Sequence, residues 1–212
     1  MFDVANEFEF WGRQAVEHAE LAHQMLEVEP LRSQALQMRN ELGAMYDAQN
    51  LGAFLPLLQR SIDFKRAALA QQRSGTWIGW AFPSMVEHMI DEESFALARM
   101  QGQPIAPTDL LRFWLHERAG ETAVGAHLID PSALPAVLHL TKTSLRFRAL
   151  ENAPPSPATA LATETLAAQA NAELLATTPN SPPSIISIPL RNHIAREGAR
   201  CVQTLQALRG RR

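Results

Sequence analysis

The sequence is poor in the residues that mark several large classes of protein. Cys201 is the only cysteine among 212 residues, so the chain cannot form an internal disulfide, as is usual in a reducing compartment. It lacks the run of roughly 18 apolar residues that a membrane helix needs. Met1-Phe2-Asp3 is not followed by the basic and apolar regions of a signal peptide. We therefore expect a cytoplasmic protein without a membrane partner.

A strong charge of one sign is also absent. The formal net charge is −3, and no basic stripe runs through the chain, so nucleic acid is not expected as a partner. Glycine-rich phosphate loops, a Gly-x-Ser-x-Gly elbow and Cys-x-x-Cys pairs are missing, which disfavours nucleotide-binding, hydrolase and zinc-ribbon functions. A hydrophobic share of 46% and a charged share of 19% are typical of a globular protein.

What the sequence does have is helical periodicity along its length. Apolar residues recur at helical spacing, and Gly, Pro and Asn fall between the periodic segments. No segment is a convincing strand, so we predict an all-α bundle of up-and-down helices. On the second segment, Leu36, Leu42 and Met45 are expected to face inward. The expected helices are 4–28, 31–50, 53–72, 77–101, a segment around 113–114 that ends at 130, 132–151, 158–177 and 188–209, with a loop at 178–183. In the fourth of these, Pro83 marks either a kink or the true start of the helix.

The pattern of the first half returns in the second. Phe10-Trp11 returns as Phe113-Trp114, a displacement of 103 positions. Self-similarity of this kind is typical of a duplicated fold. The stretch Gly102–Pro107 is the best boundary between the halves. We therefore predict two four-helix repeats, 1–103 and 104–212, packed together as one globular unit.

The strongest motif is a duplicated His-x-x-x-Glu. His88 and Glu92 lie on the fourth expected helix, and His193 and Glu197 follow 105 positions later. Residues four apart share one face of a helix, so each pair can direct an imidazole and a carboxylate at a common point. A solvated surface pair is the simpler alternative, but apolar residues such as Met89 flank the motif. A metal ion, or the imidazole itself, would offset the cost of burying the carboxylate.

A second pair of candidates lies on the first helix of each repeat. His18 follows Trp11 by seven residues, and Glu121 follows Trp114 by seven. If the first and last helices of both repeats form one central bundle, three imidazoles and three carboxylates face inward. Mixed nitrogen and oxygen ligands suit iron, manganese or zinc, and they resemble the ligand sets of di-iron bundles. The predicted metal ligands are His18, His88, Glu92, Glu121, His193 and Glu197.

Other residues are weaker candidates. Glu7 and Glu117 fall on the faces of His18 and Glu121, as extra ligands or as acceptors for an imidazole N–H. Cys201 shares the face of His193 and is expected to be a small core residue. The remaining histidines have no matched partner in the other repeat, which favours a surface or structural role. They are His23, His116, His127 and His139.

Short motifs spread over nearly the whole chain form one set: Phe10-Trp11 with His18, Phe82-Pro83 with His88 and Glu92, Phe113-Trp114, Asp130-Pro131, and Asn192-His193 with Glu197. Together they resemble a bacterial ferritin-like metalloprotein family of uncharacterised function, built of two tandem four-helix repeats. The resemblance implies an all-helical fold and a bound transition metal, and it implies no reaction. Glu121 stands where the family tends to have His, and Leu110 where it would have a carboxylate.

Three functions remain open. An oxygen-using oxidase or oxygenase would hold mono- or dinuclear iron or manganese with an open position beside a pocket for a small apolar substrate. A metal-handling protein would bind the ion without turnover. An interaction module would keep the polar cluster as a buried ion-pair network without metal. Apolar helix faces could pair the two repeats or two chains, so a homodimer is also open.

Overall fold

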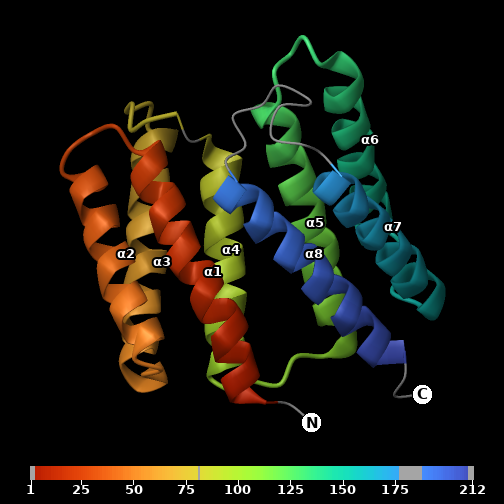
Figure 1. Ribbon diagram of the computed structural model, residues 1–212, viewed down its shortest axis with the longest axis horizontal. Helices are drawn as coiled ribbons and strands as arrows, with labels where there is room; N and C mark the ends of the chain where they lie inside the picture. Colours follow the sequence, from red (N-terminus) through yellow and green to blue (C-terminus); the bar gives the residue numbers. More distant parts are fainter. Residues whose placement is uncertain (1–2, 81, 177–187, 210–212) are drawn as a thin grey trace. The chain divides into compact units, whose positions relative to one another are not determined.

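The computed structural model describes residues 3–80, 82–176 and 188–209. Within these ranges eight α-helices form the fold and no strand occurs, and a single isolated bridge joins Leu26 to Gly79. The predicted all-α bundle of up-and-down helices is confirmed, whereas the loop expected at 178–183 lies outside the described residues. The helices (Figure 1) are α1 (Val4–Met25), α2 (Leu31–Asp47), α3 (Leu51–Arg73), α4 (Pro83–Met100), α5 (Pro107–Leu128), α6 (Leu134–Glu151), α7 (Pro157–Ala176) and α8 (Ile188–Arg209).

The chain divides into two compact units, Met1–Pro104 and Ile105–Arg212. The first contains α1 to α4 and the second α5 to α8. That 1–103 and 104–212 pack together as one globular unit stays a prediction.

The helix starts follow from the local sequence. The side chain of Asp3 accepts a hydrogen bond from the backbone N–H two residues later at 3.0 Å, and that of Asn50 accepts one three residues later at 3.1 Å. These bonds satisfy donors that the first turn of a helix leaves unpaired. Pro83 begins α4, where a missing N–H is tolerated. The fourth helix, expected over 77–101, is therefore shorter at its start.

The connection between α3 and α4 is fixed to the end of α1. Glu27 N donates to Ile78 O at 2.9 Å, and Trp80 N donates to Met25 O at 3.2 Å. Gly79 lies between these bonds with φ 145°, and a Cβ there would lie 2.0 Å from Met25 O. Only glycine fits so close an approach of two backbones.

In the first unit, α1 packs on α2 and α4, and α3 also packs on α2 and α4. Aromatic side chains fill the interior. Phe8 and Phe54 meet edge to face with ring centroids 5.1 Å apart, and Trp11 meets Phe95 in the same way at 5.5 Å. Such contacts add to the stabilisation that burial of the rings gives.

On α2 one predicted core residue is wrong. Leu36 is 38% exposed, although it was expected to face inward. The inward stripe of the helix includes the neighbouring position instead, because residues three and four apart share a face. The stripe is Leu31, Ala35, Met38 and Leu42.

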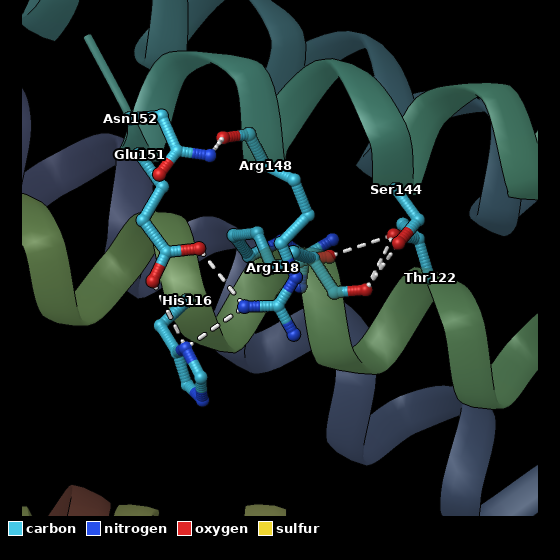
Figure 2. Close-up of polar contacts among 8 residues, drawn as sticks. His116, Arg118, Thr122, Ser144, Arg148, Glu151 and Asn152 are labelled. Carbon is cyan, nitrogen blue, oxygen red and sulfur yellow. Dashed lines mark hydrogen bonds and ion pairs between the residues drawn. The ribbon is translucent and has the colours of Figure 1, made fainter.

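In the second unit, α5 packs on α6 and α8, and α7 packs on α6 and α8. Two buried hydroxyl groups bind backbone carbonyls of α5, one from α6 and one from α5 itself (Figure 2). Ser144 Oγ on α6 donates to Ala119 O on α5 at 2.8 Å, and Thr122 Oγ1 donates to Arg118 O at 2.8 Å. Both hydroxyls are buried and bonded, so this interior accommodates polar groups at little cost.

Candidate metal centre

Pairs of side chains connect α1 to α4 in antiparallel order. A residue near the start of α1 meets one near the end of α4, and later residues of α1 meet earlier residues of α4. This register brings together two ligand candidates that the sequence placed on different helices. The pairs are Glu7 with Arg99 (Oε1 to Nη2, 2.6 Å), Trp11 with Phe95 (ring centroids, 5.5 Å) and His18 with Glu92 (Nε2 to Oε2, 3.1 Å).

The His18–Glu92 pair is buried. Its side chains are 1% and 2% exposed. A ring nitrogen and a carboxylate oxygen at 3.1 Å repel each other unless a proton or a cation lies between them, because both carry lone pairs. The pair therefore presents a nitrogen and an oxygen that share either a proton or a bound cation.

His88 lies near the same carboxylate. It is half-buried on α4, and one of its ring nitrogens lies within 4.8 Å of an oxygen of Glu92. Helical spacing predicted this proximity, because the two residues are four apart. Within the first unit, Glu92 thus has one imidazole from α1 and one from its own helix close to it.

A second buried carboxylate lies beside His18. Glu93 Oε1 accepts a hydrogen bond from Lys65 Nζ at 2.8 Å and lies 3.6 Å from His18 Nδ1. Ser61 Oγ also accepts from Lys65 Nζ, at 2.6 Å. Burial alone would raise the pKa of Glu93, but the Lys65 ammonium and the His18 imidazole outweigh it and lower the pKa. Glu93 is therefore an anion in the interior of the unit.

The second unit carries its own His–Glu pair on α8. His193 Nε2 lies 3.2 Å from Glu197 Oε1, and the two side chains are 4% and 3% exposed. The i, i+4 spacing on one helix produces this pair directly. A proton or a cation lies between these atoms for the same reason as in the first unit.

Glu121 occupies the position that corresponds to His18, and it is engaged by a cation. Arg118, one turn earlier on α5 and 1% exposed, forms an ion pair with its carboxylate. The same guanidinium donates to Ile194 O on α8 at 3.1 Å. The guanidinium thus joins two helices and neutralises a carboxylate that the sequence assigned to a metal. The ligand role of Glu121 stays a prediction.

Three buried charged residues were missed by the sequence argument: Glu93, Lys65 and Arg118. The signal for the two cations was available. Lys65 falls on the apolar stripe of α3 with Leu58 and Ile62, and Arg118 lies four residues after Trp114. A basic residue at a core position indicates a buried acidic partner, because an unpaired charge there is costly. Glu93, adjacent to a ligand candidate, gave no separate signal.

The weaker candidates have other contacts. Glu7 accepts from Trp11 Nε1 at 2.8 Å and pairs with Arg99. Glu117 is 2% exposed on α5. Cys201 is fully buried, and burial raises the pKa of its thiol to about 12, so it is neither a ready nucleophile nor a thiolate ligand at neutral pH.

The other histidines make peripheral contacts. His116 Nδ1 lies 3.0 Å from Glu151 Oε1 and 2.9 Å from Arg148 Nη1, on the same helix pair as the buried hydroxyls (Figure 2). His139 Nε2 lies 2.6 Å from Glu173 Oε2, with both side chains more than 40% exposed. Hydrogen bonds from Arg148 and His116 lower the pKa of Glu151, although partial burial alone would raise it.

The site defines a helical-bundle protein whose buried His and Glu groups could hold a metal ion. Nitrogen and carboxylate donors of this kind suit iron, manganese and zinc, so the side chains fit the ions expected from the sequence. No described helix is long and apolar enough to cross a membrane.

The names of the known proteins that resemble the chain state no function. No protein-family model matches it. Uncharacterized protein L567 of Acanthamoeba polyphaga mimivirus is 27% identical over 157 residues, which are 62% of this chain and 49% of that protein. The chain thus spans about half the length of this relative.

A solved bacterial structure has the same fold. The crystal structure of an uncharacterized protein from Bacillus cereus G9241 matches with a TM-score of 0.86 over 96% of this chain and 89% of that one, at 16% identity. At this identity the likeness concerns the fold alone. Membership of a ferritin-like metalloprotein family stays a prediction.

Proposed function

We propose that this protein binds a transition metal, iron or manganese first and zinc second, through its buried His and Glu residues. The observation that carries the proposal is the close approach of His18 Nε2 to Glu92 Oε2, at 3.1 Å. The two side chains are only 1% and 2% exposed. A carboxylate and an imidazole converge there without contact to bulk water. A metal ion between these two atoms would accept a lone pair from each of them.

The proposed ligands differ in the strength of their support. His18 and Glu92 are the best supported, followed by His193 and Glu197, whose nearest nitrogen and oxygen atoms are 3.2 Å apart. His88 is a further imidazole near Glu92. Glu121 is the least supported ligand of the set, because Arg118 already neutralises it.

A catalytic role is the finer part of the proposal. Iron or manganese held by imidazoles and carboxylates with an open position supports oxidase or oxygenase chemistry on a small apolar substrate. Metal handling without turnover needs the same ligands but a closed or exchangeable site. Oxygen consumption by the metal-loaded protein distinguishes the two.

A second candidate function is an interaction module without metal. The observation that favours it is the presence of buried ion pairs in both units, Lys65 with Glu93 and Arg118 with Glu121. In such a protein His18 and His193 would be protonated partners of their glutamates, and the polar interior would be an ion-pair network.

Metal analysis of matched variants tests the proposal. The purified protein is compared with His18→Ala/Glu92→Gln and with His193→Ala/Glu197→Gln by elemental mass spectrometry, after loading with iron, manganese or zinc. The control is His139→Ala/Glu173→Gln, which removes a His–Glu pair of the same chemistry from the exposed surface. We expect the control to retain its metal and the first variant to lose it.

The stoichiometry carries further information. If either buried-pair variant loses all the metal, one centre requires both pairs. If each loses half, every pair binds its own ion. A wild-type protein that binds no metal after loading, with variants that stay folded, would refute the proposal and favour the interaction module.

A further inference from the structure

A chain of contacts runs from α3 through α4 to α1 behind the His18–Glu92 pair. Lys65 and Ser61 come from α3, Glu93 from α4 and His18 from α1. Lys65 Nζ contacts Glu93 Oε1 at 2.8 Å, and the same oxygen lies 3.6 Å from His18 Nδ1. Each of these side chains is at most 2% exposed.

The Glu93 carboxylate is held in two ways. The residue lies on α4 next to Glu92, and its side-chain Oε1 is bound by the buried ammonium of Lys65. Lys65 in turn donates to Ser61 Oγ one helical turn away, which restricts the lysine side chain. A buried ion pair of this kind cannot rearrange without exposing an uncompensated charge to the apolar interior.

The two edges of the His18 ring face two different carboxylates. Nδ1 lies near Glu93, and Nε2 lies 3.1 Å from Glu92 Oε2. A neutral imidazole carries its proton on one nitrogen and a lone pair on the other. An anion beside Nδ1 favours the proton at that nitrogen, which leaves the Nε2 lone pair directed toward Glu92. Metal-binding histidines are commonly oriented by such a carboxylate.

We propose that Glu93, held by Lys65, is a positioning residue that fixes the ring orientation and tautomer of His18, so that Nε2 is the metal-binding nitrogen. The inference rests on the proposed function, because the orientation matters only if His18 binds a metal. Because Glu93 Oε1 is bound by Lys65 and lies beside His18 Nδ1, the proposal assigns this carboxylate to the imidazole rather than to the metal.

The second unit has no equivalent of this device at the matching position. Glu93 corresponds to Gly198, by the same displacement of 105 that relates Glu92 to Glu197. The space over Gly198 is filled by Asn171 of α7, whose Oδ1 would lie 2.8 Å from an added Cβ. In the second unit the position that matches Glu93 thus holds no carboxylate, and the position that matches His18 is Glu121 and holds no imidazole.

A purely structural role is the competing explanation. The Lys65–Glu93 pair joins α3 to α4 and could serve packing alone. Replacing a buried ion pair by apolar residues of similar size is often neutral or stabilising. A structural pair and a positioning pair therefore predict the same stability for the charge-free variant but different metal affinities.

The test uses Lys65→Met/Glu93→Leu in the full-length protein. Metal-depleted protein is titrated with Co²⁺, whose visible spectrum reports the ligand geometry. We expect affinity to fall by about 10- to 100-fold, the usual effect of losing such a carboxylate, with an altered spectrum and no loss of thermal stability in the metal-free state. The control Arg73→Met/Glu87→Gln removes an exposed ion pair between the same two helices, α3 and α4, and is expected to leave the Co²⁺ affinity unchanged.

A second readout follows the imidazole itself. Two-dimensional ¹H–¹⁵N spectra of the Zn²⁺-loaded protein identify which ring nitrogen of His18 carries the proton. We expect the proton on Nδ1 in the wild type and a loss of this single pattern in the double variant. If the double variant does not fold, Glu93→Gln keeps the shape of the side chain, and we expect weaker Co²⁺ binding from the loss of charge alone.

The outcomes separate the two proposals. The first outcome is that the wild type binds Co²⁺ and His18→Ala does not. If the double variant then binds Co²⁺ with the affinity, spectrum and His18 tautomer of the wild type, the positioning role is refuted and metal binding stands. If the wild type binds no Co²⁺, or His18→Ala binds it normally, the proposed function fails at this site and the positioning role fails with it.

Discussion

The two units solve the same electrostatic problem with different residues. In the first, a lysine on α3 neutralises Glu93, and an imidazole occupies the matched position of the first helix. In the second, the matched position is Glu121, and an arginine of the same helix neutralises it. Among the described residues, each unit thus buries one lysine or arginine, and Lys65 and Arg118 come from helices that do not correspond.

The difference teaches which part of such a bundle is constrained. Trp11 and Trp114 are both at most 2% exposed and hold matched positions, so this core position is apolar in both halves. The polar interior differs, because any neighbouring helix can supply a counter-charge to a buried carboxylate. In the first unit, the imidazole of His18 lies between the carboxylates of Glu92 and Glu93.

The largest effect is expected from Arg118→Met. The substitution leaves Glu121 buried without its cation and removes the hydrogen bond to Ile194 O, which we expect to cost roughly 3–5 kcal/mol of unfolding free energy. Urea denaturation measures it. The control is Arg148→Met, an arginine 42% exposed, for which we expect a loss of about 1 kcal/mol or less. Equal effects of the two variants would contradict the special role of Arg118.

Glu93→Leu should destabilise the first unit in the same way, because it leaves Lys65 buried and unpaired. We expect a loss of about 3 kcal/mol, recovered when Lys65→Met is added. The recovery distinguishes an unpaired charge from poor packing of the new leucine. A double variant that is as unstable as Glu93→Leu would show that packing, and not charge, dominates at this position.

The position that corresponds to Glu93 offers a smaller effect. Gly198→Ala brings a Cβ to 2.8 Å from Asn171 Oδ1, and we expect a loss of about 1–3 kcal/mol from this overpacking. Asn171→Ala in the same chain should relieve it, as measured by thermal unfolding. If Gly198→Ala is as stable as the wild type, Asn171 does not limit the space there, and the contrast between Glu93 and Gly198 has no steric basis.

The smallest effect concerns Glu151, at the partly exposed edge of the second unit. Partial burial alone would raise its pKa, but Arg148 and His116 lower it. The contribution of this carboxylate to the free energy of unfolding is therefore present above the ordinary glutamate pKa, and it is lost as the pH falls through the lowered pKa. We expect Glu151→Gln to cost at most about 1 kcal/mol at neutral pH. The difference from the wild type should disappear in acid. A difference that persists there would have a cause other than charge.

Much of the fold could be predicted from the sequence, because helical periodicity and the positions of Pro and Gly are local signals. The His88 and Glu92 spacing, and that of His193 and Glu197, placed ligand candidates on common faces in the same way. Matched positions in the two repeats marked His18 as a further inward-facing candidate, without naming its neighbour.

The rest depended on tertiary packing. That His18 lies beside Glu92 is decided by the register of α1 against α4, which no local pattern encodes. That Glu121 meets Arg118 was visible only as a basic residue on a core face, and such a residue names no partner. The prediction for Leu36 was wrong because the helices that pack against α2 decide which of its faces turns inward.

The bridge at Gly79 has a consequence for how this fold tolerates change in length. A helix that gains one residue advances by about 1.5 Å and turns by about 100°, so every side chain beyond the insertion faces a new direction. Because Gly79 ties the chain to the end of α1 and α4 begins at Pro83, the number of helical residues from Pro83 to Glu92 determines which side chain meets His18. An extra residue in this part of α4 would turn Glu92 away from His18 while the backbone hydrogen bonds of the helix stayed intact. The fold therefore tolerates added length in its surface connections better than in the first half of α4.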